Sequence, residues 1–563
     1  MGFKKVGKGF LEKEQKPAAE KGRADRIEKE LIAILSKILQ IPVEQFDNKT
    51  GFSEYGLDSV STMDFSDKID KHFKIATDPT LLFEVPNIKA LSEFVMKELK
   101  LPVEKDVPPE KKIFGEQKEA GFKPVKTDCV VNKEDIAIIG ISGRFPGAKD
   151  LDEFWKNLEA GKDSIIEIPR ERWRWEDYDG DPLGDENKTN SKWGGFLKDI
   201  REFDSAFFKI SPREAELMDP QQRLLMEEVW HTIEDSGYKV SDLSGTKTGV
   251  FVGVCNADYG ELLAENNIRL DSYTSTGSYF SIIPNRISFL LNIHGPSLAI
   301  DTACSSALIA INQAVESIRN NDSDLAIVGG TNIICHPRRY FSFSHAGMLS
   351  PDGRCKTFDK DANGYVRGEG IGAILLKPLE KAEADGDHIY AVIKATAVNH
   401  GGMATSLTAP NTNAQADLLI DAYDKAKLDP TKVSYIEAHG TGTSLGDPIE
   451  VNGLKKAFGE LYRKWDKKIA DKPTCGIGSV KTNIGHLESA AGIAGVLKVL
   501  LAMKHKKLPA TINFKELNPY IQLENSPFYI VKETQDWNAS PRIAGVSSFG
   551  FGGANAHVVI EEY

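Results

Sequence analysis

Apolar residues recur every three or four positions in the first part of the chain, which is the spacing of an amphipathic helix. In residues 24–40 this stripe consists of Ile27, Leu31, Ile34, Leu35 and Ile38. A second run extends over 58–73, a short one over 79–83 and a last one over 88–99. Four short helices in succession predict a small all-α bundle.

From Glu134 onward the pattern changes to short, continuous apolar runs that alternate with helical stretches. The first run is Ile136 to Ile139, and others are TGVFVGV (248–254), DLAIVGG (324–330), GAILLK (372–377) and VSYIEAH (433–439). Strands that are buried on both faces have this appearance, so we predict an α/β fold. No short repeat is visible, although a duplication of large halves would not show at this level.

Two polar segments lack either pattern. Residues 1–23 are rich in Lys and Glu and are predicted to be disordered. Residues 101–131 combine Pro, Lys and Glu without a period and are predicted to form a linker. We therefore expect a disordered segment (1–23), a helical domain (24–100), a linker (101–131) and an α/β domain (132–563).

Composition narrows the function classes. The hydrophobic fraction of 41% and the charged fraction of 27% are ordinary for a soluble protein. The net charge of −12 argues against a nucleic-acid binder. No signal peptide or spanning apolar stretch is present, so we expect a cytoplasmic protein without membrane contact. The six cysteines form no Cys-x-x-Cys pair, and we expect no metal site.

One cysteine lies between a predicted strand and a predicted helix. Cys304 stands in D-T-A-C-S-S-A (301–307), after the run GPSLAI and before ALIAINQAVESI. The positive end of a helix dipole favours a thiolate at such a position, and the small neighbours leave the sulfur accessible. Taken alone, the residue could equally be a buried structural cysteine.

Two histidines follow predicted strands in glycine-rich surroundings. His439 stands in E-A-H-G-T-G-T (437–443), and His486 in K-T-N-I-G-H-L-E (481–488). Enzymes of the α/β class place reactive groups at strand ends of this kind. One such histidine is commonly structural, but two of them together with Cys304 indicate a shared site.

These three motifs resemble those of the β-ketoacyl synthase family. Further matches are D-P-Q-Q-R (219–223), the run 358–370 and S-S-F-G-F-G-G-A-N-A-H (547–557), so that the similarity covers Glu134 to about Glu562. The resemblance implies a thiolase-like αβαβα layered domain made of two similar halves, which forms a homodimer. It also implies an enzyme that transfers acyl groups and joins them by decarboxylative Claisen condensation, as in polyketide chain elongation and antibiotic biosynthesis.

The resemblance assigns a role to each matching residue. Cys304 would be the nucleophile that carries the acyl chain. His439 and His486 would donate their ring N–H groups to the oxygen of the extending thioester, and Lys481 would orient the site. Phe549 would gate the pocket, and its backbone N–H would form a second oxyanion hole with that of Cys304.

A serine opens the second predicted helix of the small domain, in G-L-D-S (56–59). By its residue type alone Ser59 is a helix N-cap. The surrounding bundle is acidic, with 14 Asp and Glu against 10 Lys and Arg in residues 24–100. Together these features resemble the acyl carrier protein family, in which this serine holds 4'-phosphopantetheine covalently. A helix N-terminus is also a favourable place for a phosphate.

The motif N-H-G-G (399–402) suggests a subtype, because many modular synthases carry N-Q-D-G there. This version resembles modular polyketide synthases whose acyltransferases act in trans. We then expect several partners: acyl and malonyl thioesters on carrier proteins, a trans-acting acyltransferase, a phosphopantetheinyl transferase and other synthase modules. His400 itself is expected to be structural.

Three other functions compete with elongation. A non-elongating ketosynthase would pass the chain on without condensation, but such domains tend to lack the residue at His439. A degradative thiolase pairs one histidine with a second cysteine, which the Cys–His–His set disfavours. A carrier and docking scaffold without catalysis stays open from the sequence.

Overall fold

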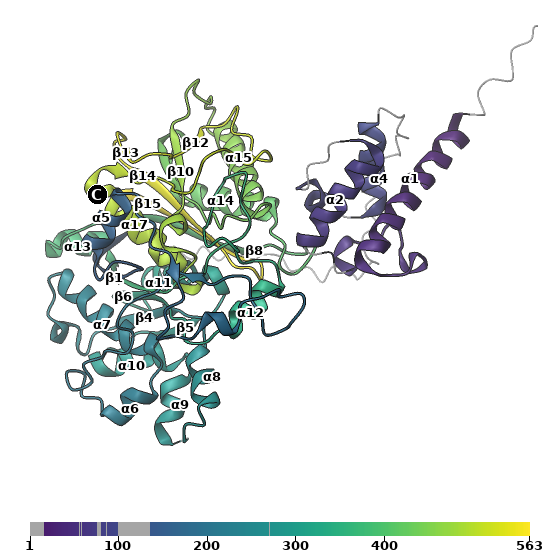
Figure 1. Cartoon of the computed structure of the whole chain (residues 1–563). Helices are drawn as coiled ribbons and strands as arrows, with labels where there is room; N and C mark the ends of the chain where they lie inside the picture. Colours follow the sequence, from purple (N-terminus) through teal and green to yellow (C-terminus); the bar gives the residue numbers. More distant parts are fainter. Residues whose placement is uncertain are drawn as a thin grey trace, which may run out of the picture. The chain divides into compact units, whose positions relative to one another are not determined.

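The computed structural model describes residues 16–55, 57, 59–75, 80–85, 87–99, 135–269 and 271–563. It contains two compact units, a small helical one near the N-terminus and a large α/β one (Figure 1). The predicted linker, 101–131, lies outside the described residues.

The small unit is a bundle of α-helices: α1 (Lys16–Leu39), α2 (Ser59–Phe73), α3 (Leu81–Glu84) and α4 (Ile88–Glu98), with 3₁₀ turns at Val43–Gln45 and Phe52–Tyr55. Its buried core includes Leu31, Leu35, Phe65, Leu91 and Val95, which lie on the predicted apolar stripes. Asn87 caps α4 by accepting the N–H of Ala90 at 3.0 Å. The predicted four-helix bundle is thus confirmed.

The prediction of disorder over residues 1–23 is wrong for residues 16–23, which belong to α1. Ala, Lys and Glu all favour helix, so this polar stretch extends the apolar-striped segment that follows it. Residues 1–15 lie outside the described residues.

The large unit contains an eleven-stranded sheet in the order β12-β10-β9-β14-β15-β8-β1-β7-β6-β4-β5. The first half of the domain contributes β1 (Ile136–Arg144), β4 (Thr248–Gly253), β5 (Ser297–Ile300), β6 (Leu325–Asn332) and β7 (Gly370–Pro378). The second half contributes β8 (Ala391–His400), β9 (Val433–Glu437), β10 (Cys475–Gly478), β12 (Phe528–Ile530), β14 (Ile543–Phe549) and β15 (Ala554–Glu562).

The two halves have the same topology. The order β5-β4-β6-β7-β1 in the first half matches β10-β9-β14-β15-β8 in the second. In each half the first three strands are parallel, the fourth is antiparallel to the third, and the fifth is antiparallel to the fourth. Strands β1 and β8 then pair across the centre, with Ile136 opposite Ile393. The two similar halves that the family resemblance implied are therefore confirmed by the strand order.

Helices cover both halves of the sheet and fill the space between them (Figure 1). Helices α11 (Ser306–Arg319) and α17 (Ala491–His505) pack against both halves in the central core. Helices α7 (Pro220–Asp235) and α10 (Ile282–Leu291) cover the outer face of the first half, and α14 (Thr412–Ala426) and α15 (Gly446–Lys464) that of the second. This is the predicted αβαβα layering.

The alternation along β1 shows why the sheet is sandwiched. Ile136 and Ile138 belong to the central core, whereas Ala137 and Ile139 belong to the outer core beneath α7. Because side chains of a strand alternate between faces, a strand with helices on both sides is apolar throughout.

Shorter elements complete the large unit. They are α5 (Leu151–Glu159), α6 (Pro212–Leu217), α8 (Asp258–Glu265), α9 (Ser272–Ser278), α12 (Arg338–His345), α13 (Leu379–Asp385), α16 (Lys481–Ile484), β2 (Ile166–Glu167), β3 (Trp193–Gly194), β11 (Lys507–Leu508) and β13 (Gln535–Asp536). Within the described residues, no helix combines the length and the apolar character that crossing a membrane requires.

Candidate active site

Cys304 lies in a sharp turn between β5 and α11. The turn is a 3₁₀ segment, Ala303–Ser305, and Ala303 has a φ of 56°. A residue with a side chain seldom adopts this left-handed conformation, so the turn is strained. It is held by Ser306, whose hydroxyl accepts the N–H of Thr302 at 2.9 Å. Cys304 is partly exposed, whereas the two serines that follow it are buried.

The thiol of Cys304 is protonated at neutral pH. Burial raises its pKa to about 12, and the negative charge of Glu488 acts in the same direction. Lys481 and the backbone N–H groups of Phe551 and Cys304 lower the pKa by less. The sequence predicted that the helix start would favour the thiolate. In the resting site, burial and the charge of Glu488 act against that preference.

His439 follows β9 in a loop that is fixed by charged side chains. Glu450 accepts the backbone N–H groups of His439 and Gly440 at 2.7 and 2.8 Å. The ammonium group of Lys481, itself buried, donates to the backbone oxygen of His439 at 2.5 Å. These contacts hold the backbone on both sides of the ring.

His486 follows α16 and Gly485, whose φ of 80° turns the chain toward the site. Its Nδ1 accepts the backbone N–H of Glu488 at 3.0 Å, so the ring proton resides on Nε2. Nε2 is buried and has no hydrogen-bond partner among the described residues. A buried donor without a partner is costly, so a ligand oxygen would satisfy it.

The two imidazole rings lie together and are neutral. Their centroids are 5.4 Å apart, and the planes are nearly perpendicular. Burial holds the pKa of each histidine well below its usual range, and the charge of Lys481 lowers it further. Burial also lowers the pKa of Lys481, whereas Glu437 and Glu450 raise it. Neutral imidazoles can donate a hydrogen bond without bringing a charge into the site.

Cys304 belongs to the same cluster. Its thiol is close enough to Lys481 and Glu488 for their charges to alter its pKa. The helices that follow the two motifs, α11 and α17, pack against each other in the central core. Gly492 permits this approach, since a Cβ there would lie 2.7 Å from the side chain of Leu308. The site thus forms where the two halves of the domain meet.

The two phenylalanines of the S-S-F-G-F motif have different positions. Phe549 is the last residue of β14, where it pairs with Asn555, and its ring lies 5.6 Å from that of His439. Phe551 lies in the turn after the strand, and its backbone N–H interacts with the sulfur of Cys304. The sequence analysis assigned to Phe549 the backbone N–H that faces Cys304, but the structure gives this role to Phe551. Phe549 still belongs to the strand ladder, whereas Phe551 lies in the turn beyond its end. Sequence reasoning missed Phe551, although it stands only two residues further on.

His400 fixes this turn, in line with its expected structural role. Its Nδ1 accepts the N–H of Gly402 at 3.0 Å, so Nε2 carries the proton and donates to the backbone oxygen of Gly552 at 3.0 Å. The N-H-G-G segment is thereby attached to the turn that contains Phe551.

Ser59 belongs to the small unit and opens α2, as predicted. The first N–H groups of a 15-residue helix have no partners within the helix, so they can face a phosphate attached there. This position fits a phosphopantetheine arm on Ser59.

A surface cleft of about 1220 Å³ lies between β1, α5 and α7, but none of the residues above lines it. Within the described ranges, no three His, Cys, Asp or Glu side chains are grouped so that they could hold a metal ion.

Family models match most of the chain. Residues 29–95 match the phosphopantetheine attachment site. Residues 133–382 and 390–515 match the N-terminal and C-terminal domains of β-ketoacyl synthase, and 518–563 match the C-terminal extension of ketoacyl synthetases.

Among curated proteins, the chain is 48% identical to polyketide synthase PksN of Bacillus subtilis, over 96% of this chain and 10% of that protein. It is 45% identical to PksM of the same organism, over 94% of this chain and 12% of that protein. The chain therefore spans about a tenth of the length of these relatives.

Solved structures show the same likeness. A ketosynthase from module 6 of the bacillaene synthase of Bacillus subtilis, in a cysteine-to-serine mutant form, is 45% identical, with a TM-score of 0.71 over 76% of this chain and 72% of that one. The oxazolomycin ketosynthase domain OzmH KS7 of Streptomyces albus is 43% identical, with a TM-score of 0.72 over 76% and 75%.

Proposed function

Because the chain belongs to the β-ketoacyl synthase family of polyketide synthases and carries a phosphopantetheine attachment domain, we propose that it elongates a polyketide chain by decarboxylative condensation at Cys304. The observation that supports this most is a pair of neutral imidazoles near the same buried lysine as the thiol, one of which has a buried Nε2–H without a partner among the described residues. A thioester oxygen that gains negative charge would complete its hydrogen bond.

In the first half-reaction, the sulfur of Cys304 attacks the carbonyl carbon of an incoming acyl thioester after losing its proton. A new carbon–sulfur bond forms, and the thiol of the donor leaves with a proton. The oxygen of the tetrahedral intermediate becomes negative, and the backbone N–H groups of Cys304 and Phe551 are the donors that we assign to it. Phe551 here replaces Phe549 in the role inferred from the sequence.

In the second half-reaction, a malonyl thioester loses CO2, and the electron pair of the broken bond forms an enolate. His439 and His486 donate hydrogen bonds to the enolate oxygen. The enolate carbon then attacks the acyl carbonyl on Cys304, so that a carbon–carbon bond forms and the sulfur of Cys304 leaves. Lys481 positions His439 through its backbone oxygen and lowers the pKa of Cys304.

The small unit supplies the attachment point for carrier chemistry. A phosphopantetheine arm provides the thiol on which an acyl unit travels, and we assign its attachment to Ser59. Treatment with a phosphopantetheinyl transferase and coenzyme A should add the mass of one arm to the wild-type chain and none to Ser59→Ala.

The N-H-G-G segment (399–402) supports a further assignment, namely that malonyl units come from an acyltransferase acting in trans. Carrier-bound acyl chains and other modules of a longer synthase are then the reaction partners. A trans-acting acyltransferase should load malonate on the small unit, and a failure to do so with a competent enzyme would contradict this subtype.

We also propose that the large unit forms a homodimer through β5. This strand is the edge of the sheet, and its outer side has no strand partner within the described residues. Large apolar side chains are exposed on and near it, including Leu298 at 45% and Phe289 at 86%. An open apolar edge of this kind is suited to pairing with a second copy.

The deciding experiment separates the two half-reactions. The phosphopantetheinylated chain is first incubated with an acyl N-acetylcysteamine thioester, and intact-mass spectrometry should find the acyl group on the wild type and not on Cys304→Ala. A malonyl-loaded carrier is then added, and a β-ketoacyl carrier should form. An acyl enzyme without condensation would indicate a non-elongating ketosynthase, and no acyl enzyme at all would leave a carrier scaffold.

A further inference from the structure

A buried ion pair lies directly behind the active site, between Arg367 and Glu488. Arg367 Nε donates to Glu488 Oε1 at 2.6 Å and Nη2 to Oε2 at 3.3 Å. The arginine side chain is fully buried, and its guanidinium carbon lies 4.9 Å from the ring of Tyr340 and 5.4 Å from that of Phe343. Burying two charges is costly even when they are paired, so stability alone is a weak explanation for this arrangement.

Glu488 connects this pair to His486 through its backbone. Its N–H is the donor to Nδ1 of the imidazole, and Glu488 itself has a φ of 48°. A non-glycine residue in this conformation requires its surroundings to hold it there. The two hydrogen bonds from Arg367 provide that restraint on the side chain.

The segment around Arg367 also holds the backbone of His486. The N–H of His486 donates to the oxygen of Val366 at 2.6 Å, and the N–H of Gly368 donates to the oxygen of His486 at 2.8 Å. The segment 366–368 therefore restrains His486 in two ways. Val366 and Gly368 form hydrogen bonds with the backbone of the histidine, and the Arg367 side chain binds Glu488, whose N–H contacts the imidazole ring.

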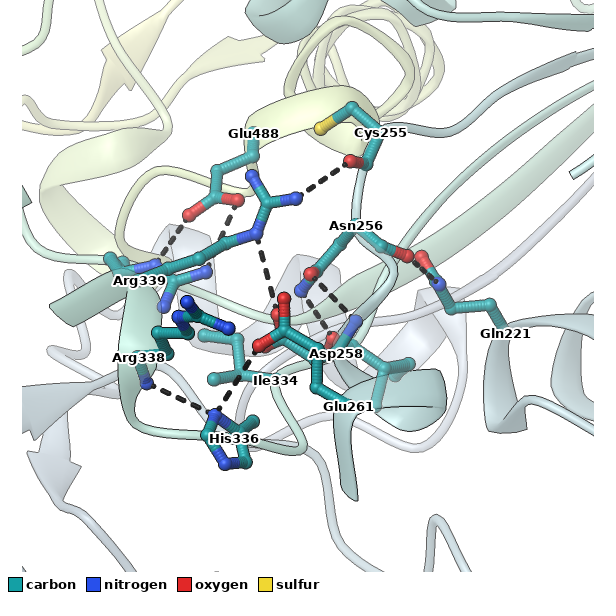
Figure 2. A network of polar contacts seen from close by, with 12 residues as sticks. Gln221, Cys255, Asn256, Asp258, Glu261, Ile334, His336, Arg338, Arg339 and Glu488 are labelled. Atoms are coloured by element: carbon teal, nitrogen blue, oxygen red, sulfur yellow. Dashed lines mark hydrogen bonds and ion pairs between the residues drawn. The ribbon is translucent and has the colours of Figure 1, made fainter. Parts of the chain in front are cut away.

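Further charged residues lie near Glu488 (Figure 2). Arg339 Nε lies 3.3 Å from the buried carboxylate of Asp258, and its Nη2 donates to the backbone oxygen of Cys255 at 3.3 Å. The negative charge of Asp258 also acts on Arg367 and favours its cationic form. The guanidinium of Arg367 is thus bound by Glu488 and also lies in the field of a second carboxylate.

We propose that Arg367 is a positioning residue for condensation. Its ion pair with Glu488 keeps the N–H of Glu488 on Nδ1 of His486, so that the ring proton stays on Nε2, where the enolate oxygen needs a donor. The inference rests on the proposed function, because it concerns the second half-reaction, in which His486 acts.

The charges around His486 give this role a distinct pH dependence. The groups that face its ring are Lys481 on the preceding helix, Arg367, Glu488, Tyr365 and His439, with the Cys304 thiol in the same cluster. The cations of Lys481 and Arg367 both lower the pKa of His486. Loss of Arg367 removes one cation and leaves the Glu488 carboxylate unpaired, and both changes raise that pKa.

The test uses the full phosphopantetheinylated chain and measures two rates in each variant. The first is acylation of Cys304 by an acyl N-acetylcysteamine thioester, and the second is condensation of the preformed acyl enzyme with a malonyl-loaded carrier. In Arg367→Met we expect condensation to fall about a hundredfold relative to acylation, as when an oxyanion donor is lost. Acylation itself should slow only as far as the unpaired charge of Glu488 raises the pKa of Cys304. The acid limb of the condensation profile should also move to higher pH. Arg367→Lys should restore part of the rate.

A double variant and a matched control separate positioning from folding. Arg367→Met with Glu488→Gln leaves no unpaired buried charge but still removes the restraint, so it should fold and show the same selective loss. Arg172→Met breaks another buried pair, with Glu369 at 3.1 Å, and should lower thermal stability without changing the ratio of the two rates.

An unchanged ratio of condensation to acylation in the folded double variant would overturn the proposal, as would an equal selective loss in Arg172→Met. If the wild type itself forms no acyl enzyme or no condensed product, the proposed function fails instead.

Discussion

At the residue scale, the chemistry depends on side chains whose charges are suppressed. Cys304 is a thiol, and His439 and His486 are neutral imidazoles, in each case chiefly because burial disfavours the charged form. Lys481 is buried among them; burial lowers its pKa, whereas nearby Glu437 and Glu450 raise it and favour the cation. The site is therefore suited to stabilising a charge that appears on the substrate during the reaction.

We expect the two histidines to act on condensation and not on acylation. Replacing either His439 or His486 by Ala should lower the condensation rate by about 10²–10³-fold, because one oxyanion donor is lost. Acylation of Cys304, followed by intact-mass spectrometry, should persist. An equal loss in both steps would place the histidines in acyl transfer instead.

The raised pKa of Cys304 has a measurable consequence. Only the thiolate reacts with iodoacetamide, so the alkylation rate should rise about tenfold per pH unit between about pH 6 and 9, well below a pKa of about 12. Lys481→Met should react more slowly at each pH, since the lysine cation lowers that pKa. Cys304→Ser gives the background from other cysteines, and a plateau near pH 7 would show that the thiol is more acidic than the site implies.

At the element scale, the close contact of α11 with α17 brings the motifs of the two halves together. The contact depends on Gly492, where a Cβ would lie 2.7 Å from Leu308 Cγ and 3.0 Å from its backbone nitrogen. The backbone nitrogen of Leu308 cannot move unless α11 shifts, and the first turn of α11 directly follows Cys304.

Substitutions at two helical glycines should therefore have opposite effects. Gly492→Val overpacks the helix contact and should destabilise the fold by about 1–3 kcal/mol in denaturant unfolding, with a loss of condensation. Gly459 in α15 has nothing within 4 Å of its Cβ position, so Gly459→Ala should stabilise the fold by about 0.4–1 kcal/mol. Equal effects of the two substitutions would contradict this account of the helix contact.

At the scale of the whole molecule, the two halves of the large unit share a strand order but contribute different groups. The first half supplies Cys304 after β5, and the second supplies His439 after β9 and His486 after β10. Since β5 and β10 hold equivalent places in their halves, the nucleophile and one imidazole follow equivalent strands. A duplicated scaffold thus carries a single, asymmetric site.

The homodimer can be tested at this scale. Light scattering of the purified chain should give twice the mass of 62.0 kDa. Leu298→Lys with Phe289→Glu places charges on the open edge beside β5 and should give a monomer, whereas Leu183→Lys, at another exposed apolar residue, should not. A monomeric wild type would contradict the proposal.

Much of this organisation was predicted from local patterns. The helix starting at Ser59, the strands that end before Cys304 and His439, and the α/β class follow from periodicity, which burial imposes within a few residues. The helical state of residues 16–23 was missed, since a polar composition alone does not distinguish a solvated helix from a disordered segment.

The amino-acid sequence alone specified the elements and the residues that can do chemistry, because secondary structure and reactivity are properties of short segments and single side chains. Three features could be found only in the folded chain. They are the burial that raises the pKa of Cys304, the position of the Phe551 N–H at the sulfur in place of that of Phe549, and the hydrogen bonds from Arg367 to Glu488 next to His486. These features depend on contacts between residues that are distant in sequence and on the exclusion of water from the space between them. Both arise only when the two halves of the large unit pack together.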